Sequence, residues 1–156
     1  MRDRIPDPCR LLVVGINPGR LTEEVDAPFA HPGNRFWPAL ERAGITPYRV
    51  HAERGLADED AAMLAGMGIG FTNFVDRMTP RASALTREEL VAGGDKVRAC
   101  VARHRPDVVM VVGIGAFRDA YRAPKAKRGL QPERLAGVPV WVVGNPSLSL
   151  IHISEP

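Results

Sequence analysis

The stretch LLVVGINPG (residues 11–19) decides the fold of this chain. Its four consecutive branched apolar residues predict a strand that is buried on both faces, as in a parallel sheet. The strand ends at Gly15 and turns through Asn17, which leaves a side-chain amide at the carboxyl end of the strand. Ligands of open α/β sheets bind at that edge. The stretch therefore predicts a sheet and a candidate site, while a turn without chemistry remains the alternative.

Three further apolar segments predict strands of the same sheet. They lie at residues 68–75, 108–112 and 138–143. Helical patterns occur between the strands, at residues 35–44, 57–64, 86–104 and 114–121. This alternation favours an α/β three-layer sandwich with a central four-stranded parallel sheet flanked by helices. Residues 20–34 are expected to form a long loop, and residues 122–134 a basic linker.

The first and the fourth predicted strands both end in an Asn-Pro turn. Asn17 and Pro18 follow the first strand, and Asn145 and Pro146 follow the fourth. We expect these two strands to be neighbours at a point where the strand order reverses, because ligands bind at such points. The two turns would then form the walls of one cleft.

Composition restricts the class of protein. A chain of 156 residues fits one domain, and its net charge of +3 with a pI of about 9.2 suits a polyanionic partner. Cys9 and Cys100 are expected to be free thiols in a reducing compartment, and two cysteines cannot supply a four-cysteine metal site. The apolar runs are far shorter than the roughly 20 residues that a membrane helix needs. We expect a cytoplasmic protein that needs no metal and no cofactor.

Five blocks of sequence, in this order, resemble the mismatch-specific uracil/thymine DNA glycosylases, a branch of the uracil-DNA glycosylase superfamily. The blocks are GINPG (15–19), PFAHPGNRFW (28–37), GFTNFVDRMTP (70–80), ELVAGG (89–94) and NPS (145–147). The resemblance implies a four-stranded parallel sheet between helices. It also implies that the protein flips a uracil mispaired with guanine out of double-stranded DNA and hydrolyses its N-glycosidic bond in base-excision repair. Thymine and modified cytosine are further candidate substrates.

The resemblance assigns the catalytic role to Asn17. A side-chain amide cannot act as a strong base, but its carbonyl oxygen can hold and orient a water molecule. GINPG contains no carboxylate that could form a covalent intermediate, so we expect a monofunctional glycosylase. The expected substrate-binding residues are Gly15, Ile16, Pro18, Gly19, Phe29, Asn73, Asn145, Pro146 and Ser147.

Several of these assignments have structural alternatives. The resemblance makes Phe29 the residue that stacks on the flipped base, although it could instead anchor a loop. Asn73 could contact the edge of the base or could satisfy loop backbone. His31 is expected to hydrogen-bond within its loop, and Asn34 to cap the helix that follows. A basic run could contact phosphates or form a solvated face, and it consists of Arg118, Arg122, Lys125, Lys127 and Arg128.

The last nine residues, LSLIHISEP (148–156), depart from the resembling pattern. They look like the translation of a sequencing adaptor, so we expect a single glycosylase domain at residues 1–147 followed by a non-native tail. A natural divergent tail is the alternative. In the family that the chain resembles, a final helix follows this point, and its loss would uncover apolar surface and weaken the protein.

The expected partner is double-stranded DNA with a mismatched or damaged pyrimidine. We expect the protein to act as a monomer and not to bind a membrane. Two other classes of function remain open. The chain could be a non-catalytic nucleotide- or DNA-binding α/β domain, including an inactive fragment of the glycosylase. It could also hydrolyse small nucleotides, and it would then cleave free nucleosides without any dependence on duplex DNA.

Overall fold

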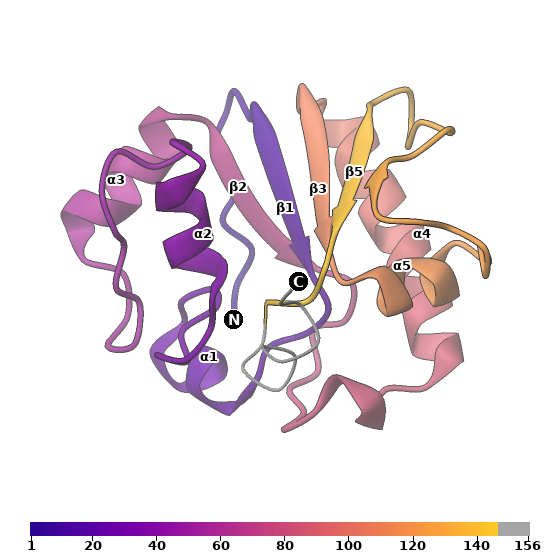
Figure 1. Cartoon of the computed structure of the whole chain (residues 1–156), viewed down its shortest axis with the longest axis horizontal. Helices are drawn as coiled ribbons and strands as arrows, with labels where there is room; N and C mark the ends of the chain where they lie inside the picture. Colours follow the sequence, from indigo (N-terminus) through magenta and orange to yellow (C-terminus); the bar gives the residue numbers. More distant parts are fainter. Residues whose placement is uncertain (147–156) are drawn as a thin grey trace.

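The computed structural model describes residues 1–146, which form an α/β fold around one sheet (Figure 1). The strands are β1 (Leu11–Gly15), β2 (Ile69–Asn73), β3 (Val108–Val112), β4 (Gly129–Leu130) and β5 (Val140–Val143). Their order in the sheet is β2-β1-β3-β5-β4. The four predicted strands pair in parallel, as expected, and β4 adds a short antiparallel edge to β5. The expected sheet is therefore confirmed, except that a fifth strand forms within the predicted basic linker.

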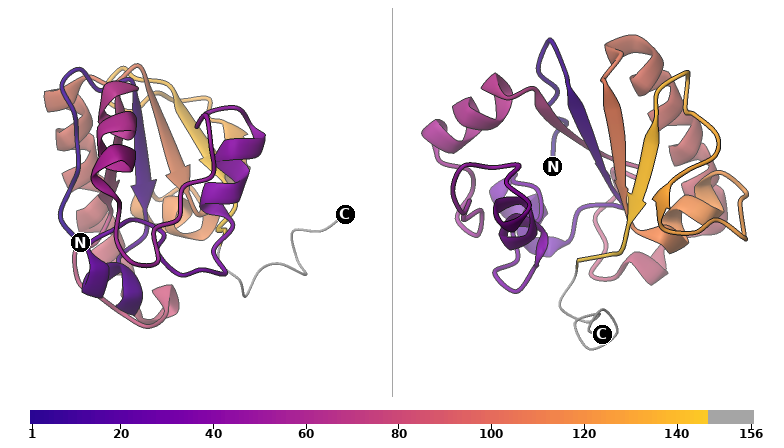
Figure 2. Two further views of the ribbon diagram at one scale, coloured as in Figure 1. Left: turned by 90° about the vertical axis from the view of Figure 1, so that its left-hand side faces the viewer. Right: turned by 45° about the horizontal axis from the view of Figure 1, so that its top comes forward.

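Helices cover both faces of the sheet, as the three-layer prediction requires. They are α1 (Arg20–Val25), α2 (Phe36–Arg42), α3 (Asp58–Gly66), α4 (Arg87–His104) and α5 (Ile114–Ala120), with a 3-10 turn at Ala82–Ala84. Figure 2 shows α2 and α4 on opposite sides of the sheet. The prediction of a continuous loop at residues 20–34 was wrong, because α1 forms there.

The central strand β1 separates two apolar cores. Successive side chains of a strand point to opposite faces. Leu12 and Val14 therefore pack in the core that α4 and α5 cover, whereas Val13 packs with residues of α2, α3 and β2. All three side chains are fully buried. This two-sided burial explains why β1 is continuously apolar.

The block ELVAGG explains how closely α4 approaches its neighbours. A Cβ atom on Gly93 would lie 2.3 Å from the carbonyl oxygen of Phe74, and one on Gly94 would lie 2.6 Å from that of Ala120. Any larger residue would therefore push α4 away from the end of β2 or from α5. A capping box begins α4, since the side chains of Thr86 and Glu89 each bond to the backbone of the other residue.

The predicted adjacency of the first and fourth strands is wrong. β3 lies between β1 and β5, so the strand order reverses between β1 and β3. The reason is that the chain places β2 beside β1 and then crosses to the other side of β1 before it adds β3 and β5. The carboxyl ends of β1, β2, β3 and β5 still lie at one edge of the sheet, because these strands are parallel.

One face of β5 stays open to solvent. Trp141 is 47% exposed, and its partner across the strand pair, Leu130, is 57% exposed. Val143, two residues after Trp141 on the same face, is also exposed. This apolar face beside β4 is where self-association is expected, since large exposed apolar patches promote it.

We expect the double substitution Trp141→Thr with Leu130→Thr to reduce self-association, because threonine suits strands and removes the apolar face. Binding of the dye ANS should fall by roughly half, and light scattering should show less aggregate. Met67→Thr is the control, since Met67 is similarly exposed but lies at the end of α3. Equal effects of both changes would contradict a role for the face on β5.

Candidate active site

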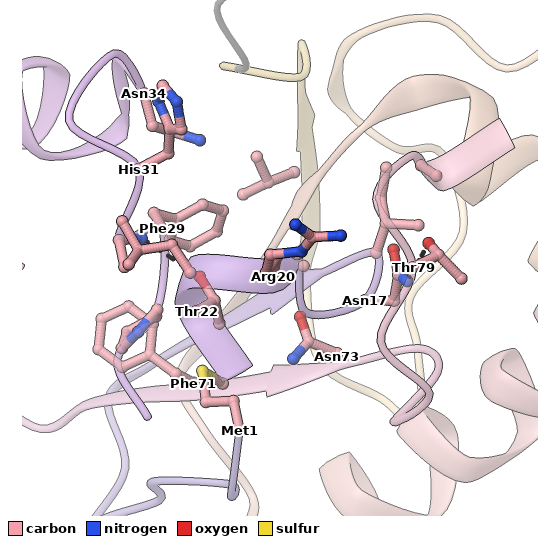
Figure 3. A pocket seen from close by; sticks show the side chains of 18 of the residues that line it. Met1, Asn17, Arg20, Thr22, Phe29, His31, Asn34, Phe71, Asn73 and Thr79 are labelled. Carbon is pink, nitrogen blue, oxygen red and sulfur yellow. Dashed lines mark hydrogen bonds between the residues drawn. The ribbon is translucent and has the colours of Figure 1, made fainter. Parts of the chain in front are cut away.

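A cavity of about 870 Å³ opens at the carboxyl ends of β1, β2 and β3. It brings together residues from distant parts of the chain, and Figure 3 shows how several of their side chains face it. The predicted site residues in its lining are Gly15, Ile16, Asn17, Gly19, Phe29, Asn73 and Asn145. Asn17 and Asn145 thus share one cavity, although their strands are not adjacent.

Pro18 and Pro146 are not among the described residues that line the cavity, and their contact with substrate stays a prediction. Pro18 is buried, and its carbonyl oxygen accepts a hydrogen bond of 3.2 Å from the Thr79 N–H. The carbonyl oxygen of Pro146 accepts one of 3.0 Å from the Arg35 N–H. Both prolines therefore hold the turns in place. Ser147 lies outside the described residues.

The amide of Asn17 is held in one orientation. Its Nδ2 donates to the carbonyl oxygen of Arg77 at 2.9 Å and to Oγ1 of Thr79 at 2.7 Å. The Thr79 hydroxyl donates in turn to the carbonyl oxygen of Arg81 at 2.7 Å, so it can only accept from Asn17. Both amide protons are thereby used, and Oδ1 of Asn17 remains to accept a hydrogen bond from a ligand or water.

The segment that holds Asn17 is itself anchored to α4. The guanidinium of Arg77 donates two hydrogen bonds of 2.9 Å to the carboxylate of Glu89. The Arg77 guanidinium, helped by the Thr86 N–H, lowers the pKa of the Glu89 carboxyl to about 2. The carboxylate therefore stays charged at neutral pH. Glu89 thus both caps α4 and fixes the segment that orients Asn17.

Sequence reasoning did not single out Thr79 or Arg77. Both lie in the block GFTNFVDRMTP, so the resemblance included them without assigning them a role. No spacing rule places a residue of this block against Asn17, some 60 positions earlier in the chain. Their partnership depends on the parallel pairing of β1 with β2, which brings the two following turns together.

Asn73, the last residue of β2, lies against Gly15 at the bottom of the cavity. Only 8% of Asn73 is exposed, and no described residue hydrogen-bonds to its side chain. A Cβ atom on Gly15 would lie 2.4 Å from Oδ1 of Asn73, which explains the glycine. The alternative that Asn73 satisfies loop backbone finds no support, because its amide makes no such bond.

Phe29 presents an aromatic face to the cavity. Its ring stacks on Phe36 with the centroids 3.9 Å apart, which leaves the opposite face for a ligand. Nε1 of Trp37 donates to the carbonyl oxygen of Pro28 at 3.0 Å and fixes the start of this loop. The backbone φ of Phe29 is +51°, an unfavourable value for a bulky residue that the loop imposes.

The prediction that His31 hydrogen-bonds within its loop is confirmed, whereas the N-cap of α2 is Arg35 and Asn34 lies one residue before it. Nδ1 of His31 accepts a hydrogen bond of 3.0 Å from the Gly33 N–H. Oδ1 of Asn34 accepts one of 2.9 Å from the Phe36 N–H at the start of α2. His31 and Asn34 also border the cavity, on the side of Phe29 (Figure 3).

The described residues 1–146 contain no group of three or more His, Cys, Asp or Glu side chains that could hold a metal ion. Over the same residues, no helix is both long and apolar enough to cross a bilayer. Cys9 and Cys100 are free, and burial raises the pKa of both thiols. Both thiols are therefore protonated at neutral pH.

Taken together, the sheet and its cavity define an α/β protein with a ligand site at the strand ends. The aromatic face of Phe29 and the side-chain amides of Asn17 and Asn73 suit a planar ring with polar edges. The model of the uracil DNA glycosylase superfamily matches residues 3–153, and the chain belongs to this superfamily. Its members are DNA glycosylases, hydrolases that act on DNA in base-excision repair.

Proposed function

We propose that this protein is a monofunctional DNA glycosylase that removes uracil mispaired with guanine, with thymine and modified cytosine as further candidate substrates. One observation carries the proposal. The Asn17 amide is locked so that its carbonyl oxygen remains available in a cavity that also contains Phe29 and Asn73. We also propose that the protein acts as a single subunit in the cytoplasm, without a cofactor.

The cavity suits a flipped pyrimidine. The free face of Phe29 can stack on the ring, a contact that tolerates several bases. The Asn73 amide carries a donor and an acceptor, and these complement the adjacent acceptor and donor on the edge of uracil. Gly15 leaves room because it has no Cβ atom. Binding by stacking and one amide therefore supports a pyrimidine substrate.

Asn17 would orient the attacking water. Its Oδ1 accepts one proton of the water and directs the oxygen toward C1′ of the sugar. Because an amide is a weak base, most of the barrier must be lowered by stabilising the departing pyrimidine anion. Backbone N–H groups of the turn at residues 15–19 are the donors we assign to that role. No lysine lines the described part of the cavity, which supports hydrolysis without a lyase step.

A mismatch lowers the cost of flipping. A base mispaired with guanine is easier to unpair and unstack than a paired one, and this difference provides selectivity. The basic run at residues 118–128 would add a modest contribution from phosphate contacts. Within it, Nε of Arg118 donates to the carbonyl oxygen of Ala126 at 2.9 Å, which orients the side chain and leaves its charge and its other donors available.

The test is a duplex with a single G:U pair, incubated with the protein and then with alkali. Strand breaks are expected at the uracil of the G:U duplex. In A:U duplexes we expect breaks to form more slowly or not at all. Binding without breaks would instead indicate a non-catalytic DNA-binding domain. Release of base from free nucleosides, with no preference for duplex DNA, would indicate a nucleotide hydrolase.

We further propose that residues 148–156 are not native to this domain. These residues lie outside the described part of the chain, and the match to the superfamily model extends into them as far as residue 153. The genomic sequence immediately after the codon for Ser147 tests the proposal. A codon for a residue other than Leu148 would support it, whereas a genomic match through Pro156 would contradict it.

A further inference from the structure

Arg20 brings a positively charged side chain to the cavity. Among the described lining residues, it alone has a guanidinium or ammonium side chain, and Glu24 alone has a carboxylate. Arg20 is the first residue of α1 and is exposed. Figure 3 shows its guanidinium projecting between Phe29 and Asn17. A cation therefore lines the same cavity as the residues proposed to hold the base and the water.

No residue of the described range 1–146 makes a hydrogen bond or an ion pair with the guanidinium of Arg20. By contrast, the guanidinium of Arg77 is bound to Glu89, and that of Arg2 is bound to Asp26. Glu24 follows one turn later on α1 but does not pair with Arg20, and an arginine that precedes its acid is the weaker order for such pairs.

The geometry of the cavity indicates what Arg20 binds. A nucleotide with its base between Phe29 and Asn73, and with its sugar carbon facing Asn17, must leave its phosphates outside the base pocket. Arg20 is the described lining residue that can neutralise such a phosphate. Arginine binds phosphate through two parallel hydrogen bonds, which also fix the orientation of the group.

We propose that Arg20 binds a backbone phosphate that flanks the flipped nucleotide and thereby strengthens the binding of that nucleotide in the cavity. This inference rests on the proposed glycosylase function. Arg20 should therefore affect the affinity for DNA and the salt dependence of that affinity, with little effect on the chemical step. The proposed contact is bidentate, which distinguishes it from a general attraction between a basic protein and DNA.

The experiment compares Arg20→Gln, Arg20→Lys and Arg103→Gln with the unchanged protein. Arg103→Gln removes the same charge near the end of α4, which lies where β3 begins and thus opposite the cavity. Single-turnover excision from a G:U duplex, measured against protein concentration, gives the half-saturating concentration and the limiting rate. Fluorescence anisotropy with the same duplex, at several salt concentrations, gives the affinity and its salt slope.

For Arg20→Gln we expect a half-saturating concentration about tenfold higher, since a charged hydrogen bond is lost, and a limiting rate within about twofold. The salt slope should fall by about one. Arg20→Lys should keep most of the salt slope, because the charge remains, but should lose part of the affinity for DNA. Arg103→Gln should change neither the salt slope nor the affinity.

Two results would overturn the inference. One is that Arg20→Gln behaves like Arg103→Gln. The other is a lower limiting rate at unchanged affinity, which would place Arg20 on the departing base. Absence of strand breaks with the unchanged protein would refute the proposed function instead, and anisotropy would still decide whether Arg20 contacts phosphate.

Discussion

Excision of uracil should fall about 10³-fold when Asn17 is replaced by alanine, because the side chain that orients the water is lost. Binding of a G:U duplex should change little, since Asn17 is not proposed to hold the base. The measurement is the single-turnover rate constant, with affinity from anisotropy on the same duplex. Full activity of Asn17→Ala would exclude the assigned role.

Thr79 provides a sharper control for the same prediction. Thr79→Val keeps the shape of the side chain but removes the acceptor for Nδ2 of Asn17, so the amide can turn. We expect an intermediate loss of rate with unchanged affinity, and recovery in Thr79→Ser, which restores the hydroxyl. Equal rates of Thr79→Val and the unchanged protein would show that the orientation of Asn17 does not depend on this bond.

The parallel sheet could be predicted because each of its strands has a local signal. β1 and β3 are continuously apolar, which follows directly from their burial between two layers of helices. α1 has no comparable signal, since it has six residues, none of them buried, and no side-chain cap. β4 has only two residues and exists because β5 offers its backbone for pairing. Elements that depend on a distant partner escape local patterns.

The candidate site was predictable to a similar extent. Turns at the ends of parallel strands must meet at one edge, so Asn17 and Asn145 could be placed together from the sequence. The order of the strands depends on which crossover the chain takes, and the predicted adjacency of β1 and β5 failed for that reason. Thr79 was missed because its role is visible only in its contact with Asn17.

Gly15→Ala should lower kcat/KM for uracil excision at least about 10²-fold, comparable to other small misplacements in active sites. The new Cβ atom would lie 2.4 Å from Oδ1 of Asn73, so the amide must move. Packed protein limits its movement elsewhere, and the cavity is the open space beside it. The displaced amide would then occupy the position proposed for the base. Thermal unfolding should show that the fold is intact.

The double substitution Gly15→Ala with Asn73→Ala separates this explanation from a general disturbance of β1. Removal of the Asn73 amide relieves the clash, so the double variant should be no less active than Asn73→Ala alone. The two effects are then strongly non-additive, as expected for residues in direct contact. Losses that simply add would show that Gly15→Ala acts elsewhere. In that case Asn73 would not be the group that Gly15 accommodates, and its proposed contact with the base edge would lose its main structural support.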